Sequence, residues 1–255
     1  MRQKFGETRS SIKDKHALMS ADSFEQTTLP NWKETAIVVV ISPHVGAAFS
    51  QYFATLTPAS VGGAPYVEGI ERFFFVLDGA VSLSVAEQEH TLEAEGYAYL
   101  PAGTSHQITT RSDSARIVVL ERRYGGLPHQ GEVPPMVVGS TLEITSGPLK
   151  GDESLQLKKL MPEDERYDFE VNTMDFEPGA SLSYVETHFM EHGLLMLNGG
   201  GVYRLDDSWY SVQEGDIIWM GPFCAQWFGA IGKSNARYLI YKNWNRDPLD
   251  PTSML

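Results

Sequence analysis

The feature that most constrains the fold is a series of strand and turn signals that occurs twice, about 120 residues apart. A β-rich run leads into the hairpin dipeptide Asp78-Gly79, and a second such run leads into Asn198-Gly199. Further pairs keep nearly the same spacing: Gly96 with Gly215 (119 residues), His106 with Gln226 (120) and Ala115 with Ala236 (121). This near-constant offset predicts the duplication of one all-β unit.

Each unit is expected to be a small antiparallel barrel or jelly roll, in which inward-facing positions of neighbouring strands converge on one cavity. The predicted organisation is an N-terminal arm (1–35), an N-terminal β-domain (36–140) and a C-terminal β-domain (141–255). Prolines and glycine between about 130 and 165 predict a linker without regular elements. Within it, Leu155–Asp164 is the one candidate helix, limited by Pro162.

Composition excludes several classes of function. The net charge of −13 and the absence of a basic run argue against nucleic acid or anionic membranes as partners. No apolar run approaches the ~18 residues of a membrane span, and the first 30 residues lack the apolar core of a secretion signal, so a cytoplasmic location is expected. The single cysteine, Cys224, excludes an internal disulfide and is predicted to be a small buried residue.

The candidate functional site is Glu186-Thr-His188-Phe-Met-Glu-His192. If this segment is extended, Glu186, His188 and His192 share parity and face one side, whereas Glu191 faces the other. Two imidazoles and a carboxylate suit a divalent ion such as Mn, Fe or Zn. The alternative is that His-x3-His lies on one face of a surface helix.

The two units resemble cupins in their motif order. In the C-terminal unit the first cupin motif reads Glu186-x-His188-x3-His192-x6-Gly199, with glutamate and histidine exchanging their usual places. The second motif runs from Gly215 through Gly221 to Gln226, where glutamine replaces the metal-binding histidine. Every replacement retains a group that can bind a metal.

This permuted set is similar to that of the (S)-ureidoglycine aminohydrolase family, manganese-dependent two-domain cupins of purine (allantoin) catabolism. The segments that carry the resemblance are Tyr184–Gly193, Gly201–Tyr203, Glu214–Asp216, Met220-Gly221 and the tail Tyr241–Asp247, with weaker similarity at Gly69–Glu71, Gly96–Tyr99 and Arg122–Tyr124. Together they extend over nearly the whole chain beyond residue 35.

The resemblance implies one Mn²⁺ per chain, with Fe²⁺ or Zn²⁺ as alternatives. Its ligands would be Glu186, His188, His192 and Gln226, and the substrate-contacting residues would include Glu186, Tyr203 and Lys242. The implied reaction replaces the amine of (S)-2-ureidoglycine by hydroxyl, which yields (S)-ureidoglycolate and ammonia. Glu186 would orient or deprotonate the attacking water, and Lys242 would pair with a substrate oxygen.

The N-terminal unit departs from this pattern. The 120-residue offset places Tyr66, Glu68 and Arg72 at the first-motif positions and His106 at the second. A fixed guanidinium charge opposes cation binding, so this unit is predicted to hold no metal. His106 is expected to be a core histidine with its hydrogen bonds satisfied.

Two other functions remain open on the sequence alone. One is another cupin metalloenzyme, such as an Fe/Mn oxygenase or an isomerase acting on a small organic acid, because fold does not determine chemistry. The other is a non-catalytic two-domain cupin that binds a small acid. Many strand edges and five tryptophans favour a homo-oligomer.

Overall fold

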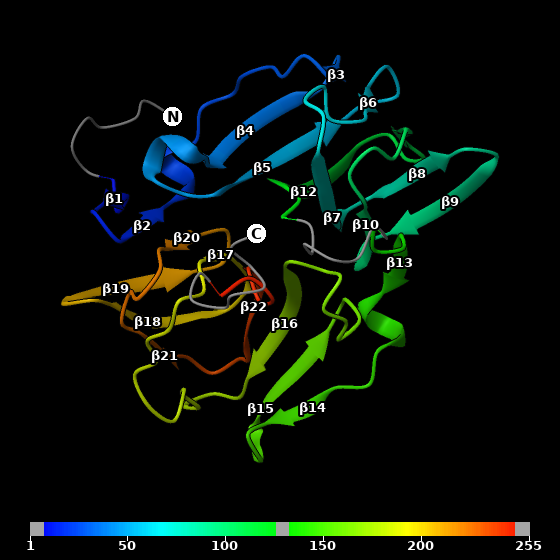
Figure 1. Cartoon of the computed structure of the whole chain (residues 1–255). Coiled ribbons are helices and arrows are strands. Elements are labelled where there is room, and N and C mark those ends of the chain that lie inside the picture. Colours follow the sequence, from blue (N-terminus) through cyan, green and yellow to red (C-terminus); the bar gives the residue numbers. More distant parts are fainter. Residues whose placement is uncertain (1–7, 126–132, 248–255) are drawn as a thin grey trace. The chain divides into compact units, whose positions relative to one another are not determined.

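The computed structural model describes residues 8–125 and 133–247, and these residues form strands, short 3₁₀ turns and loops (Figure 1). They divide into two compact units. Residues 25–43, 48–125 and 133–143 form the N-terminal unit, and residues 8–24, 44–47 and 144–247 form the C-terminal unit. The all-β expectation is confirmed. Among the described residues, no helix has the length and hydropathy that crossing a membrane requires.

The N-terminal unit consists of a six-stranded and a five-stranded antiparallel sheet. In spatial order, the larger sheet contains β13 (Val137–Ser140), β10 (Gly96–Leu100), β7 (Ile70–Asp78), β12 (Ala115–Arg123), β5 (Phe49–Leu56) and β4 (Ala36–Ile41). The smaller sheet contains β3 (Trp32–Lys33), β6 (Val61–Gly63), β11 (His106–Thr110), β8 (Ala80–Val85) and β9 (Gln88–Glu93).

The C-terminal unit consists of an eight-stranded and a three-stranded sheet. The larger contains β1 (Ser11–Ile12), β2 (His16–Met19), β20 (Ile217–Met220), β17 (His192–Asn198), β22 (Ala236–Lys242), β16 (Glu170–Phe176), β15 (Asp152–Lys159) and β14 (Gly147–Leu149). The smaller contains β19 (Ser208–Gln213), β18 (Gly200–Leu205) and β21 (Gln226–Ala230). Short 3₁₀ turns occur at Ala21–Ser23, Pro43–Val45 and Thr141–Glu143.

Strand registers confirm the duplication. Arg72 of β7 pairs with Leu100 of β10 and Glu121 of β12. Its counterpart His192 of β17 pairs with Met220 of β20 and Lys242 of β22, so each partner is offset by 120 or 121 residues. Sequence positions that match across the repeat therefore occupy equivalent places in the two sheets.

The hairpin dipeptides of both units end in glycine for the same structural reason. Gly79 and Gly199 adopt φ values of 73° and 66°, which side-chain-bearing residues rarely take. A Cβ would also lie 2.3 Å from the carbonyl oxygen of Ser114 at Gly79, and 2.5 Å from that of Asn235 at Gly199. These contacts explain why glycine ends both predicted hairpin dipeptides.

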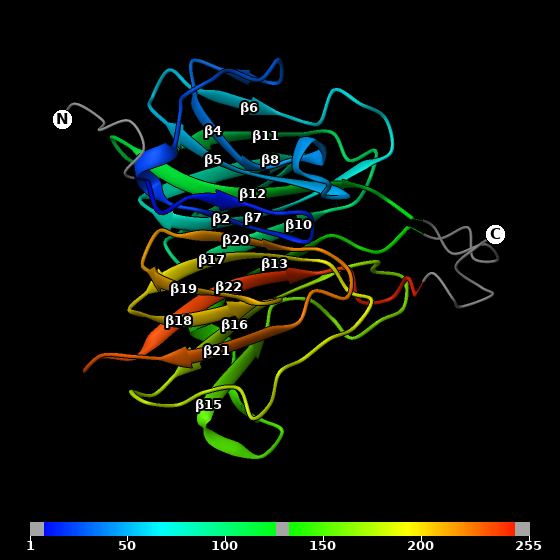
Figure 2. The ribbon, with the colours of Figure 1, turned by 90° about the vertical axis from the view of Figure 1, so that its left-hand side faces the viewer.

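An early strand of each repeat pairs with the sheet that the rest of the other repeat forms. Ala17 of β2 lies opposite Trp219 of β20, and Val137 of β13 lies opposite Tyr99 of β10. Both members of the first pair are 120 residues from their counterparts in the second, so β2 and β13 are equivalent strands that have been exchanged (Figures 1 and 2). The structure thus divides the predicted arm 1–35, because residues up to 24 belong to the C-terminal unit and the rest to the N-terminal unit.

The predicted helix at Leu155–Asp164 is wrong. Residues Asp152–Lys159 form β15, which pairs with β16 on one side and with β14 on the other. Leu155 and Leu157 have the period-2 spacing of a strand, and Leu155 is buried. The prediction of a linker without regular elements is also wrong where the structure describes it, since β13, β14 and β15 lie between 137 and 159. Residues 126–132 of that predicted linker lie outside the described residues.

Candidate active site and metal centre

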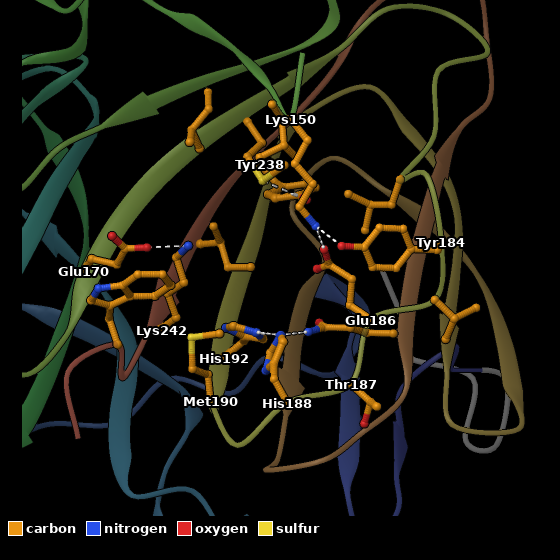
Figure 3. A pocket seen from close by; sticks show the side chains of 18 of the residues that line it. Lys150, Glu170, Tyr184, Glu186, Thr187, His188, Met190, His192, Tyr238 and Lys242 are labelled. Carbon is orange, nitrogen blue, oxygen red and sulfur yellow. Dashed lines mark hydrogen bonds and ion pairs between the residues drawn. The ribbon is translucent and has the colours of Figure 1, made fainter. Parts of the chain in front are cut away.

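The six predicted site residues all line one cavity of about 570 Å³ in the C-terminal unit (Figure 3). These are Glu186, His188, His192, Tyr203, Gln226 and Lys242. Apolar side chains form much of the remaining wall, among them Met174, Leu182, Tyr238 and Ile240. A cavity of this size with a few converging polar groups is typical of a small-molecule site.

The local backbone explains how the polar side chains meet. His192 is the first residue of β17 and pairs with Lys242, the last residue of β22. Gln226 is the first residue of β21, and it forms an isolated bridge with Glu186 through two backbone hydrogen bonds of 2.8 Å. Residues directly opposite in an antiparallel bridge project to the same side. His188 lies between Glu186 and β17 in a loop, so the single continuous strand that would align all three ligands is not formed.

The two histidines face each other through their Nε2 atoms, which lie 3.3 Å apart. Nδ1 of His192 lies 3.2 Å from the backbone oxygen of Tyr241 and donates its proton there, which leaves Nε2 as an acceptor. Burial lowers the pKa of His192 well below its usual value, and burial also lowers that of His188. Both rings are therefore held in the neutral form that binds metals.

The donor atoms are spaced as ligands of one ion. Nε2 of Gln226 lies 2.9 Å from Nε2 of His188, and half a turn of the amide would bring its oxygen, a metal donor, to the same place. Neighbouring ligands of a six-coordinate ion with bonds of about 2.1 Å are about 3 Å apart. The residues present therefore fit a divalent cation between His188, His192 and Gln226.

Lys150 is a site residue that the sequence did not reveal. It lies in the turn between β14 and β15 and its Nζ is 2.8 Å from Oε1 of Glu186 (Figure 3). The same amine hydrogen-bonds to the hydroxyl of Tyr184 and lies 4.3 Å from the centre of that ring. Glu186 is thus held by a cation at the wall of the cavity, and among the described residues its carboxylate does not form a group with both histidines in which all ligand atoms lie within 4.8 Å of one another.

Glu170 is a second residue that the sequence did not reveal. It lies directly opposite Lys242 in the pairing of β16 with β22, and its carboxylate forms an ion pair with the lysine amine. The amine also lies 5.1 Å from the centre of the Trp244 ring. These contacts orient Lys242 on the cavity wall, opposite Lys150 in Figure 3.

Tyr203 contributes a buried phenol to the cavity. Its ring packs 5.5 Å from that of Phe228, and 1% of the residue is exposed. Burial strongly raises the pKa of the Tyr203 hydroxyl, so the group stays protonated and can donate a hydrogen bond. Glu191, set aside on parity, does not line the cavity and accepts a hydrogen bond of 2.8 Å from Nε1 of Trp219.

The equivalent place in the N-terminal unit is filled by Arg72. Its guanidinium lies 2.7 Å from Nε2 of His106 and donates to Oε1 of Glu121 at 2.8 Å. Nδ1 of His106 donates to the backbone oxygen of Thr104 at 2.8 Å, so the prediction of a satisfied core histidine is confirmed. Tyr66 is exposed at the surface. The positively charged guanidinium of Arg72 thus occupies the place where the C-terminal unit has its candidate metal ligands.

Comparisons with known proteins agree with this architecture. A family model described as a cupin domain matches residues 52–121, in the N-terminal unit. The structure of a putative glyoxylate induced protein from Pseudomonas aeruginosa is similar over 96% of this chain and 93% of that one, with a TM-score of 0.86 and 28% identity. The expectation of two tandem cupin units is confirmed.

Two curated relatives carry the same name in organisms that are far apart. A protein of Oryza sativa subsp. japonica, called probable (S)-ureidoglycine aminohydrolase, is 44% identical over 245 residues, which is 96% of this chain and 78% of the rice protein. An (S)-ureidoglycine aminohydrolase of Escherichia coli (strain K12) is 32% identical over 238 residues, or 91% of this chain and 89% of that protein.

Proposed function

Since the chain belongs to the (S)-ureidoglycine aminohydrolase family and is an enzyme, we propose that it hydrolyses (S)-ureidoglycine to (S)-ureidoglycolate and ammonia. The observation that carries this proposal is the convergence of His188, His192 and Gln226 beside Glu186 in one cavity. Two lysines on the wall, Lys150 and Lys242, supply the local positive charge that an anionic substrate needs in a chain of net charge −13.

The cation of the proposed site is Mn²⁺, held by Glu186, His188, His192 and Gln226. Two oxygen donors beside two imidazoles favour Mn²⁺ or Fe²⁺ over Zn²⁺, which prefers softer ligands. When bound, such an ion supplies Lewis-acid polarisation of the substrate and lowers the pKa of a water molecule. One ion per chain is expected, because Arg72 fills the equivalent place in the N-terminal unit.

The side chains of the cavity would transfer protons, bind the substrate and exclude water. Glu186, released from Lys150, accepts a proton from the attacking water. Lys242, oriented by Glu170, pairs with an anionic or carbonyl oxygen of the substrate, and the Tyr203 hydroxyl donates a hydrogen bond to it. The apolar wall excludes bulk water from the reacting carbon.

The reaction exchanges two bonds at one carbon. The oxygen of water forms a bond to the carbon that carries the carboxylate, and the bond from that carbon to the amine breaks. The amine nitrogen leaves as ammonia with one of the protons of water, and no oxidant or reductant is needed. Attack from a fixed face of the bound substrate would yield the (S) product.

In the cell, this activity would place the enzyme in the catabolism of purines through allantoin. A cytoplasmic location, a homo-oligomeric state and the lack of nucleic-acid or membrane partners remain predictions of the sequence.

Ammonia release from freshly generated (S)-ureidoglycine tests the proposal directly. Purified protein supplied with Mn²⁺ should release ammonia faster than the spontaneous reaction, whereas His192→Ala and Glu186→Gln should reduce release to that background. His106→Gln is the matched control, because it alters the equivalent position to Gln226 in the other unit and should retain activity at neutral pH. Release by the native protein at the spontaneous rate would refute the assignment.

A further inference from the structure

The C-terminal unit contains a second group of potential metal ligands that does not line the cavity. A ring nitrogen of His16, a carboxylate oxygen of Asp206 and the sulfur of Cys224 all lie within 4.8 Å of one another. His16 begins β2, Asp206 lies in the turn between β18 and β19, and Cys224 lies in the loop before β21 (Figure 1). Three segments far apart in sequence thus bring one nitrogen, one oxygen and one sulfur donor together.

The imidazole of His16 lacks one of its two hydrogen bonds. The residue is 2% exposed, and its Nε2 lies 2.9 Å from the hydroxyl of Tyr210. Its Nδ1 is buried and has no hydrogen-bond partner among the described residues. Buried polar atoms are nearly always satisfied in native proteins, so this orphaned nitrogen indicates a missing ligand. Cys224 is also buried, and within the described part of the chain its sulfur makes one long hydrogen bond, of 3.7 Å, to the oxygen of Ala225.

The duplicated unit shows that the fold itself does not need these three side chains. At an offset of 120 residues the counterparts of His16, Asp206 and Cys224 are Met136, Ala86 and Thr104. Ala86 adopts φ 51° and Asp206 adopts φ 54°, so the turn does not require a carboxylate. Met136 packs against the core of its unit, so the first position does not require an imidazole. Packing and turn geometry therefore do not require the three donors, and the Asp206 carboxylate itself makes one long hydrogen bond, of 3.5 Å, from the backbone N–H of Ala225.

We propose that His16, Asp206 and Cys224 bind a structural Zn²⁺ ion. Histidine nitrogen, cysteine thiolate and aspartate oxygen are the usual protein donors to zinc, and a water molecule would complete the fourth position. The Tyr210 hydroxyl, which contacts Nε2 of His16, would hold the ring with Nδ1 toward the ion. Donors in a tetrahedral zinc site lie roughly 3.3 to 3.8 Å apart, so the cluster needs only a small contraction. The thiolate selects Zn²⁺ over Mn²⁺, which distinguishes this ion from the one in the cavity.

The ion would connect the exchanged strand β2 to the loop before β21. Cys224 lies two residues before Gln226, whose backbone pairs with Glu186 at the cavity. β2 reaches the C-terminal unit from the other end of the chain and pairs with β20. Zinc at the cluster would therefore fasten β2 to the loop that leads into β21 and Gln226.

Cobalt titration tests the site with a readout that is independent of activity. Chelator-treated protein is titrated with Co²⁺, and the near-ultraviolet charge-transfer band of a cobalt thiolate is followed. Cys224 is the only cysteine, so such a band can arise only from this cluster. We expect the band to appear, to survive His192→Ala at the cavity site, and to be displaced by Zn²⁺. Absence of the band in the native protein would overturn the proposal.

Variants that copy the other repeat give matched controls. Cys224→Thr should abolish the band, and His16→Met and Asp206→Ala should each weaken Co²⁺ binding at the band by at least tenfold, with circular dichroism unchanged. Asp206→Ala lies in a turn whose shape Ala86 already adopts, so it should fold even if the buried variants do not. A band with an unchanged midpoint in Asp206→Ala and His16→Met would show that the cluster is not the binding site.

Discussion

The buried pair of Arg72 and His106 makes the stability of the N-terminal unit depend on pH. Burial, and then the charge of Arg72, lower the pKa of His106 to about 4, against an opposing hydrogen bond to Thr104. Nε2 of the neutral ring accepts from the guanidinium at 2.7 Å, and a protonated ring would turn two donors toward each other. His106 therefore stays neutral in the folded protein at pH values where the unfolded chain already binds a proton.

The size of the effect follows from the two pKa values. Above the unfolded value of 6.5 neither state is protonated, and the stability is fully present. Between 6.5 and about 4 only the unfolded state binds the proton, so stability falls as the pH falls. At about 1.36 kcal/mol per unit, a difference of about 2.5 units corresponds to a loss of about 3 kcal/mol, with no further loss below pH 4 from this group.

The assay compares native protein with His106→Gln, which carries the residue found at Gln226 in the other repeat. Urea unfolding is measured from pH 7.5 to 4 with chelator present, and the indole NMR signal of Trp32 reports on this unit, because Arg72 lies 5.3 Å from that ring. Carboxylate titration is common to both proteins, so the native protein should lose about 3 kcal/mol more than the variant over this range. Parallel loss in the two proteins would refute the reasoning.

Two further substitutions test single contacts. Lys150→Met should tighten Mn²⁺ binding by up to about fivefold in calorimetry, because it frees Glu186 from a half-exposed ion pair worth about 1 kcal/mol at most; weaker binding would show instead that Lys150 supports the site. Arg9→Ala should lower the free energy of unfolding by about 1–2 kcal/mol, because Arg9 makes two hydrogen bonds of 2.8 and 2.7 Å to the buried Asp216 but is itself partly exposed to screening solvent. Urea unfolding with unchanged stability would contradict that estimate.

The duplication was predictable because its signals are local. The hairpin glycines Gly79 and Gly199 and the β-branched runs before them depend on short stretches of chain, and the register of β7 and β17 follows from their alignment. The candidate ligands were predictable for a similar reason, since Glu186, His188 and His192 lie within seven residues.

The misassigned strand had an ambiguous pattern. In and just after β15, the spacing of Leu155, Leu157 and Leu160 fits both a strand and a short helix. Pairing with β14 and β16 stabilises the strand. Such pairing is a tertiary interaction, which the local propensity of the segment does not predict.

Residues that reach the cavity from distant strands left no signal in the sequence. Lys150 meets Glu186 from 36 residues away, and Glu170 meets Lys242 from 72 residues away. An isolated charged residue in a turn or at a strand end is common on the surface of any protein. Only the register of the large sheet shows which of them face the site.

The exchange of β2 and β13 has a consequence for the order in which the protein can be completed. During synthesis β2 emerges about 200 residues before its partner β20, so the sheet that carries the candidate metal centre stays open until β20 has left the ribosome. β13, by contrast, finds β10 already made and can close its sheet at once. The unit with the buried Arg72 guanidinium can therefore fold before the unit that contains the candidate metal site.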